Sequence, residues 1–268
     1  MRSTLPVFTP IEETLFLTLC GRALDNHLAH PILGDTMAEE IVGRLGYDCG
    51  QFHLSASPII NIAHRAKKLD EVAQRFFARH PDAVGLDLGA GLDTRVFRID
   101  PPTGVDYPRV IAARQQLVPQ RPNAHGVGAD LTGPDWLEAV PGDRPAVIVA
   151  DGLMAFLTQD DMIALLNRLT DHFPSGEVAF NGYTRFAIWA ARHYHGTQSV
   201  AGLIRSPGFD DPHEPERWNP RLRLVKELLL TREPEVAQFP PALRRFTRLS
   251  AHSTAWSRKG TTVLHYRF

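Results

Sequence analysis

The chain has 268 residues, 43% of them hydrophobic, which is enough for a sizeable buried core in one large domain or in a core with an appendage. Lys and Arg total 29 against 30 for Asp and Glu, so no overall charge favours nucleic acid or an anionic membrane. No apolar run approaches the roughly 18 residues that span a bilayer. We therefore expect a small-molecule partner, and neither nucleic acid nor a membrane.

The two cysteines, Cys20 and Cys49, are too few for a disulfide framework. We expect both to be ordinary buried thiols in a reducing, cytoplasmic setting. The stretch around Cys20, "TLFLTLCG" (14–21), is faintly like a lipoprotein signal, but it is short and it follows Glu12 and Glu13. The pattern favours an amphipathic helix instead.

Helical patterns fill the N-terminal region, residues 1–80. Apolar residues from 11 to 28 recur mainly at four-residue spacing and predict a first helix. In "DTMAEEIVGRLG" (35–46), Thr36 and the glutamate three residues later form a capping-box pair, and a glycine ends the pattern. A third amphipathic helix is predicted over about 64–79.

From residue 81 to the end of the chain the pattern changes to alternating strands and helices. The helix "TQDDMIALLNRLTDHF" (158–173) opens with Thr158 and Asp161 as a capping pair. Such alternation predicts a mostly parallel sheet with helices on both faces, an α/β fold. Strands are predicted at 83–88, 124–131, 145–157, 176–184 and 261–268, with helix or strand at 221–230.

Residues 186–222 break this alternation with several prolines and mixed charge. We interpret this segment as an inserted lid or cap over the core.

The glycine-rich turn in "AVGLDLGAGLDTRVFRID" (83–100) follows a predicted buried strand. Gly89 and Gly91 allow a sharp turn and let a ligand approach the backbone, although such a turn can also be purely structural. A dinucleotide remains an alternative, but Thr94 stands where a third glycine is expected and Asp87 brings a negative charge into the turn. Because a carboxylate repels a pyrophosphate and attracts a cation, the turn favours S-adenosylmethionine.

Two further positions are placed to hold parts of such a cofactor. Asp106 lies where a carboxylate binds ribose hydroxyls in nucleotide-binding folds; otherwise it is a solvated loop residue. Asp130 and Leu131 end the next strand and suit an adenine clamp, with a helix N-cap as the alternative for Asp130.

Four segments together resemble the leucine carboxyl methyltransferase family, in particular its bacterial polyketide O-methyltransferase branch. The similarity spans residues 12 to about 185. It implies a class I S-adenosylmethionine-dependent methyltransferase fold with a Rossmann-like sheet and an added N-terminal helical region. The segments are "RALDNHLAHPILGDTMAEEIV", "GAGLDTRVFRID", "ADLTGPDWL" and "ADGLMAFLTQDDMIALLNRL".

The resemblance also implies roles for individual residues. Asp151 matches a position that usually holds glutamate and faces the reaction centre, where it would contact the cofactor and take part in catalysis. Arg22 is a looser match for a second contact to the cofactor carboxylate. The cofactor-binding residues would be Arg65 on the methionine carboxylate, Gly89 and Gly91 along the methionyl part, Asp106 on the ribose, and Asp130 with Leu131 on the adenine.

One segment departs from the family pattern. "IDPPTGVDYP" leaves little room between Ile99 and Asp106, so the second strand is expected to be short or missing. This shortening motivates an alternative in which the chain is a non-catalytic member that binds the cofactor poorly.

The acceptor site is less well marked. Tyr183 and Arg185 follow a predicted strand and are candidates for binding the acceptor. His193, within "RHYHG" (192–196), is a candidate base for a hydroxyl acceptor, and a surface or packing residue is the alternative that a lone histidine more often represents. No acidic or cysteine ligand accompanies these histidines, so we predict no metal.

The sequence thus predicts an S-adenosylmethionine-dependent O-methyltransferase. It would act on a carboxylate or hydroxyl of a small natural product, polyketide-like or aromatic. The alternatives are the non-catalytic member described above and a nicotinamide oxidoreductase.

Overall fold

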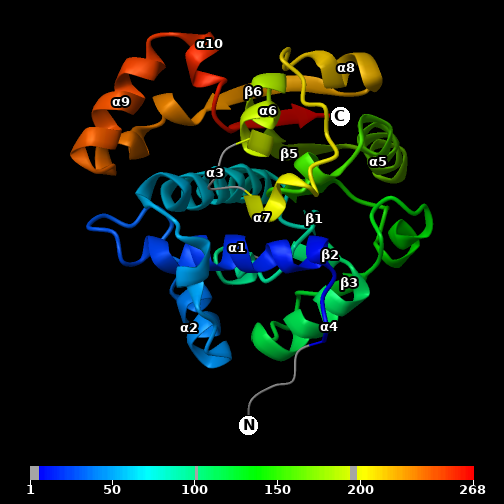
Figure 1. Cartoon of the computed structure of the whole chain (residues 1–268). Coiled ribbons are helices and arrows are strands. Elements are labelled where there is room, and N and C mark those ends of the chain that lie inside the picture. Colours follow the sequence, from blue (N-terminus) through cyan, green and yellow to red (C-terminus); the bar gives the residue numbers. More distant parts are fainter. Residues whose placement is uncertain (1–5, 100–101, 194–197) are drawn as a thin grey trace.

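The computed structural model describes residues 6–99, 102–193 and 198–268. These residues build a seven-stranded sheet in the order β3-β2-β1-β4-β5-β7-β6 (Figure 1). Strands β1 to β5 pair in parallel, whereas β7 runs antiparallel to both of its neighbours. The strands are β1 (Val84–Leu88), β2 (Pro102–Asp106), β3 (Gly126–Gly128), β4 (Ala146–Ala150), β5 (Gly176–Gly182), β6 (Arg223–Leu229) and β7 (Thr262–Arg267).

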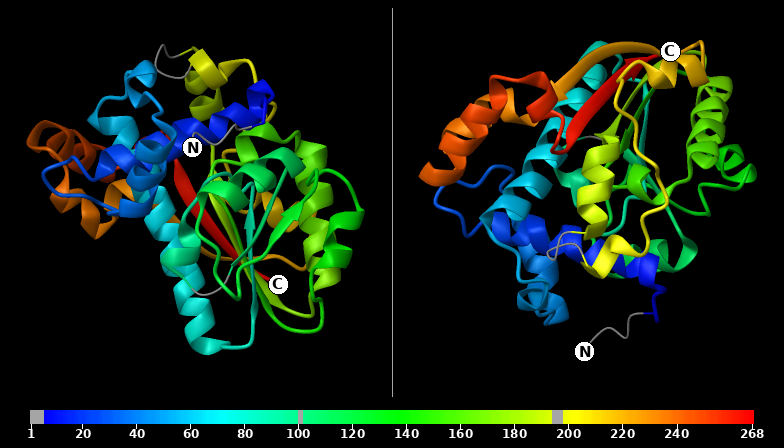
Figure 2. Two further views of the ribbon diagram at one scale, coloured as in Figure 1. Left: turned by 90° about the horizontal axis from the view of Figure 1, so that it is seen from below. Right: turned by 45° about the horizontal axis from the view of Figure 1, so that its top comes forward.

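Helices cover both faces of the sheet, as predicted (Figures 1 and 2). Side chains of a strand alternate between faces, so Val147 and Val149 of β4 pack against α3, whereas Ile148 packs on the face that carries α5. The predicted α/β class is confirmed. The helices are α1 (Pro10–Asp25), α2 (Thr36–Leu45), α3 (Ala56–Arg79), α4 (Pro108–Leu117), α5 (Gln159–His172), α6 (Arg185–His193), α7 (Gln198–Ala201), α8 (Glu214–Trp218), α9 (Pro241–Ala251) and α10 (Thr254–Ser257).

The helix boundaries differ from the predictions in two places. Asp35, rather than Thr36, caps α2, because its side chain accepts a hydrogen bond from Ala38 N at 3.1 Å. Helix α3 begins at Ala56 instead of near 64. Its first turns also bury apolar side chains, which the predicted apolar stripe did not include. The capping box that opens α5 at Thr158 is confirmed.

Helix α3 shares a core with the sheet. Its Leu69, Val72 and Phe76 are buried against side chains of β4, β5 and β7. The N-terminal helical region is therefore packed directly on the sheet, and the division of the chain at residue 80 stays a prediction.

The second strand is present, so the expectation that it is short or missing was wrong. Strand β2 has five residues, as do β1 and β4, and pairs in parallel with β1 on one side and with β3 on the other. Strand β2 itself occupies most of the segment that was judged too short, and the described chain between β1 and β2 forms the glycine turn and the short 3₁₀ helix η2 (Arg95–Phe97). Asp106 stands at the carboxyl end of β2.

The cysteines are also corrected by the structure. Cys20 in α1 and Cys49 in the short 3₁₀ helix η1 (Cys49–Phe52) form a disulfide, with their Cα atoms 5.5 Å apart. The expectation of free thiols rested on their number alone. It missed that α2 returns the chain beside α1, which brings the two sulfur atoms together.

The segment interpreted as a lid carries α6, α7 and α8. In Figure 2, α6 and α7 lie near α1 on one side of the molecule. Residues 194–196 of the histidine motif lie outside the described residues. Residues 221–230, predicted as helix or strand, contain strand β6 at 223–229. Among described residues no helix is long and apolar enough to cross a membrane.

Candidate functional site

The sheet reverses its winding direction next to β1. The chain passes from β1 outward through β2 to β3, then returns to place β4 on the opposite side of β1. Open α/β sheets bind ligands beyond the carboxyl ends of the strands at such a switch point. A cavity of about 380 Å³ lies there, and both Gly89 after β1 and Asp151 after β4 line it.

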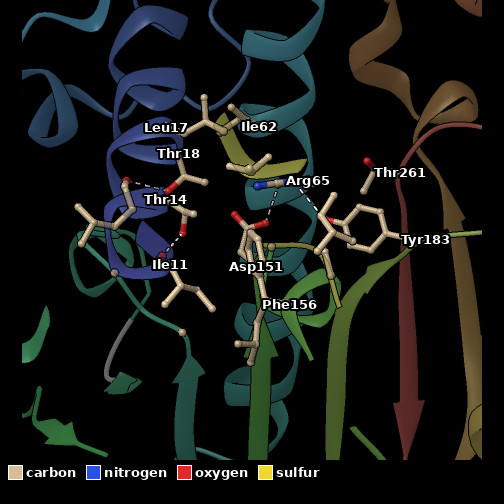
Figure 3. Close-up of a pocket in the computed structure, with 18 of the residues that line it drawn as sticks. Ile11, Thr14, Leu17, Thr18, Ile62, Arg65, Asp151, Phe156, Tyr183 and Thr261 are labelled. Carbon is tan, nitrogen blue, oxygen red and sulfur yellow. Dashed lines mark hydrogen bonds and ion pairs between the residues drawn. The ribbon is translucent and has the colours of Figure 1, made fainter. Parts of the chain in front are cut away.

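Elements from distant parts of the sequence form the cavity walls (Figure 3). Side chains of α1, including Ile11, Thr14 and Thr18, face Arg65 of α3 across the space. The residues after β4 form another wall, and Tyr183 after β5 stands at the far side.

The glycine turn has the geometry that a close ligand contact needs. Gly89 and Gly91 have φ angles of 65° and 49°, in the left-handed region that favours glycine. A Cβ atom on Gly89 would lie 3.3 Å from the Leu153 side chain, and one on Gly91 would lie 3.3 Å from Leu15. Side chains at either position would therefore narrow the cavity.

Asp106 closes this turn from the neighbouring strand. Its Oδ2 accepts a hydrogen bond from Gly91 N at 2.7 Å, and its Oδ1 accepts one from Tyr107 N at 2.7 Å. Burial raises the pKa of Asp106, although these two backbone donors oppose the shift. The carboxylate thus holds the turn in place through Gly91. It also lines the cavity, where a ligand can reach it.

Arg65 and Asp151 form the ion pair at the centre of the cavity. Arg65 Nε lies 2.8 Å from Asp151 Oδ1, and Arg65 donates a longer hydrogen bond, 3.4 Å, to the Tyr183 hydroxyl (Figure 3). Burial disfavours the charged guanidinium, but the Asp151 carboxylate outweighs this and the pKa of Arg65 is raised. Burial also raises the pKa of Tyr183, so its hydroxyl stays protonated at neutral pH.

A buried ionic network lies behind the turn. Arg95, fully buried, pairs with Asp70 at 2.7 Å, Asp93 at 3.1 Å and Asp87 at 3.4 Å. Burial raises the pKa of Asp87 to about 6 despite Arg95. Arg22, the looser candidate for the cofactor carboxylate, lies 3.3 Å from Asp35 and lines the cavity.

Other predicted residues lie outside the cavity lining. Asp130 is exposed and accepts hydrogen bonds from the Thr132 backbone N–H and hydroxyl in a local turn. It is not a helix N-cap, because the next described helix, η3 (Asp135–Ala139), begins after Pro134. Leu131 is buried in the core instead. Arg185 is exposed and lies 3.6 Å from Asp210.

The candidate base His193 is likewise exposed. Its Nδ1 lies 2.7 Å from the Trp189 carbonyl oxygen, and it does not line the cavity. Within the described ranges, no group of three or more His, Cys, Asp and Glu side chains is arranged to hold a metal ion.

Comparison with known proteins identifies the family. The profile of the leucine carboxyl methyltransferase family matches residues 16–170. The chain belongs to this family. Among family relatives, it is 36% identical over 97% of both chains to the tetracenomycin polyketide synthesis O-methyltransferase TcmP of Streptomyces glaucescens. It is 31% identical, over 83% of both chains, to the S-adenosyl-L-methionine-dependent methyltransferase dpfgK of Gibberella zeae.

Solved structures share the fold of this leucine carboxyl methyltransferase family member. A DUF574-family protein from Streptomyces avermitilis superposes with a TM-score of 0.54 at 15% identity, covering 92% of this chain and 96% of that one. The plantazolicin methyltransferase BamL, solved with a triazolic desmethylPZN analog and SAH, gives a TM-score of 0.51 at 12% identity, covering 96% and 98%. The predicted family and fold are thus confirmed.

The residues in the cavity of this family member fit S-adenosylmethionine. The glycine turn admits a ligand to the backbone, Asp106 offers a carboxylate for ribose hydroxyls, and Arg65 offers a cation for the methionine carboxylate. Asp151 Oδ2 is buried with no hydrogen-bond partner among the described residues, which is the state expected of a group that awaits a ligand.

Several cavity residues of this methyltransferase family member were missed by sequence reasoning. Four of them lie along α1 at the spacing of one helix face: Ile11, Thr14, Leu15 and Thr18. Helical spacing was therefore the signal that could have found them. Asn181 was missed too; its Oδ1 accepts a hydrogen bond from Gly152 N at 2.5 Å and holds the loop that carries Asp151. No sequence motif signals this contact.

Proposed function

We propose that the protein transfers a methyl group from S-adenosylmethionine to a carboxylate or hydroxyl oxygen of a small polyketide-like or aromatic natural product. The observation that carries this proposal is the Arg65–Asp151 pair facing the glycine turn in one cavity at the switch point. The relatives TcmP and dpfgK, named as an O-methyltransferase and a methyltransferase, support the same reaction.

The cofactor supplies an activated methyl group on its sulfonium, and the protein positions both partners. Holding two reactants in line can supply roughly 7–11 kcal/mol of the barrier reduction. In this proposal Arg65 binds the methionine carboxylate, Gly89 and Gly91 line the methionyl part, and Asp106 binds the ribose. Asp151 neutralises Arg65 and faces the reaction centre.

The acceptor end of the cavity lies beside Tyr183, which packs with the apolar side chains of Phe156, Ile188 and Ile204 in the cavity wall. Apolar walls exclude water and suit an aromatic acceptor. A carboxylate acceptor is already ionised at neutral pH, whereas a hydroxyl benefits from a base. For a hydroxyl, Asp151 is the nearest candidate, because His193 lies outside the cavity.

The alternatives lose their motivation. The non-catalytic reading rested on a missing second strand, and β2 is fully paired. A dinucleotide is disfavoured because the chain belongs to a methyltransferase family and because Asp87, which lines the cavity, would repel a pyrophosphate. We also propose a cytoplasmic location, since the methyl donor is a metabolite of that compartment.

Calorimetric titration tests the proposal. S-adenosylmethionine and S-adenosylhomocysteine should bind, and NAD should not; absence of binding by both sulfur ligands would refute it. Mass spectrometry of products from a panel of aromatic acids and phenols then identifies the acceptor class by a mass gain of one methyl group.

A further inference from the structure

The segment before β7 reaches the acceptor end of the cavity. Because β7 is antiparallel to β5, the beginning of β7 lies at the sheet edge where β5 ends, and Thr262 pairs with Gly182. Lys259, Gly260 and Thr261 therefore line the cavity near Tyr183. Lys259 is exposed, so it lies where the cavity meets solvent.

Lys259 is held between two aromatic rings. Its Nζ lies 4.1 Å from the centre of the Trp256 ring and 5.2 Å from the centre of the Phe186 ring. Trp189 extends this aromatic group, with its ring centre 5.9 Å from that of Phe186. The three rings belong to α10 and α6.

These rings remain open to solvent. Trp256 is 54% exposed, Phe186 46% and Trp189 57%. Large apolar surfaces that stay exposed together commonly mark a binding site. None of the three rings lines the cavity, whereas Lys259 does, so a planar ring system stacked on them would lie outside the cavity with Lys259 at its inner edge.

Lys259 differs from the other cations that line the cavity. Arg65 lies 2.8 Å from Asp151 and Arg205 lies 3.6 Å from Asp161, while Arg22 pairs with Asp35. In the described part of the chain, no carboxylate lies within ion-pair distance of Lys259. Its charge is therefore available to an anionic ligand.

We propose that Lys259, Trp256 and Phe186 form an outer subsite that binds an acidic group on a planar aromatic acceptor, remote from the oxygen that is methylated. This inference rests on the proposed function for the identity of the acceptor. The rings supply stacking area and the ammonium supplies charge. The subsite selects acidic aromatic acceptors over neutral ones of the same shape.

A matched pair of fluorescent probes tests the subsite without methyl transfer. The anionic probe is 8-anilino-1-naphthalenesulfonate, and N-phenyl-1-naphthylamine has the same rings without the sulfonate. Lys259→Gln should weaken binding of the sulfonate probe about three- to tenfold and change the neutral probe less than about twofold. Trp256→Ala should weaken both, and Trp256→Phe should restore most of the loss.

Lys226→Gln is the matched control, because Lys226 is also exposed and lies on β6 outside the cavity lining. Equal losses for both probes in Lys259→Gln, or an equal loss in Lys226→Gln, would overturn the subsite. Thermal unfolding of each variant checks folding. Titration of the unmodified chain with S-adenosylmethionine and S-adenosylhomocysteine tests the proposed function, which is refuted if neither ligand binds. The subsite is decided by the probe measurements alone.

Discussion

Arg65 of α3 and Asp151 after β4 lie 2.8 Å apart and are each about nine-tenths buried, so an N-terminal helix and the central strand meet in the cavity. In the proposed complex, Arg65 would contact two carboxylates, one from the protein and one from the cofactor. The ion pair would then orient the guanidinium before the cofactor binds and reduce the ordering needed on binding.

Asp151→Asn tests this orientation. The amide keeps the shape but removes the charge that holds Arg65, and a charge-assisted hydrogen bond contributes roughly 1.5–3 kcal/mol. We expect kcat/KM for methyl transfer to fall about ten- to a hundredfold, measured with S-adenosylmethionine and the acceptor found by mass spectrometry. An unchanged kcat/KM would show that Asp151 takes no part in methyl transfer.

Asp106→Ala should weaken S-adenosylhomocysteine binding at least about tenfold in calorimetric titration, because it removes both the ribose acceptor and the hydrogen bond that closes the Gly91 turn. Asp130→Ala is the comparison. Asp130 is exposed and bonded locally to Thr132, so its loss should change affinity less than about threefold. Similar losses in both variants would favour the adenine role for Asp130.

Arg95→Met should destabilise the fold by about 3–5 kcal/mol, because it leaves buried carboxylates of Asp70, Asp87 and Asp93 without their shared cation. Urea denaturation measures the change through the midpoint. Arg144→Met, which breaks an exposed pair with Asp143, is the control and should leave the midpoint unchanged.

Asp87 predicts a specific pH dependence of stability. Its pKa in the fold is about 6, above the ordinary value of 3.8, so between these values the folded chain binds more protons than the unfolded one. The stability contribution of Asp87 should therefore increase as the pH falls from about 6 to about 4. The free energy of unfolding of Asp87→Asn, followed over the same range, should lack this increase; parallel curves would contradict it.

The disulfide predicts a difference between oxidised and reduced protein. Cys20 and Cys49 are 29 residues apart, and closing a loop of that size restricts the unfolded chain by about 3–4 kcal/mol. Cys20→Ala with Cys49→Ala, or treatment with dithiothreitol, should lower the melting temperature. Alkylation with mass detection under non-reducing conditions shows whether the bond forms, and two free thiols in the purified protein would contradict it.

Local patterns predicted much of the fold. Strands with strong apolar runs, such as β4, and the Thr158 capping box follow from residues close together in sequence, and the structure has them. Strand β2 was doubted because few residues separate Ile99 from Asp106. Pairing with β1 and β3 stabilises it, and such pairing is not written in the segment itself.

The candidate site was predicted where a short motif carries it, as for Gly89, Gly91 and Arg65. Contacts made by tertiary packing escaped prediction. The Cys20–Cys49 bond and the aromatic surroundings of Lys259 join residues that no spacing rule connects. The placement of Arg185 next to Asp210 is of the same kind, because a lone charge in a sequence does not reveal its partner.

The position of β7 has a consequence for the order of folding. Strand β6 is synthesised before β7, yet β7 separates it from β5 and is its only strand neighbour in the described sheet. Strand β6 therefore has no strand partner until β7 has been synthesised. Because Thr261 lies directly before β7 and lines the cavity, that side of the cavity is completed only when the last strand is in place.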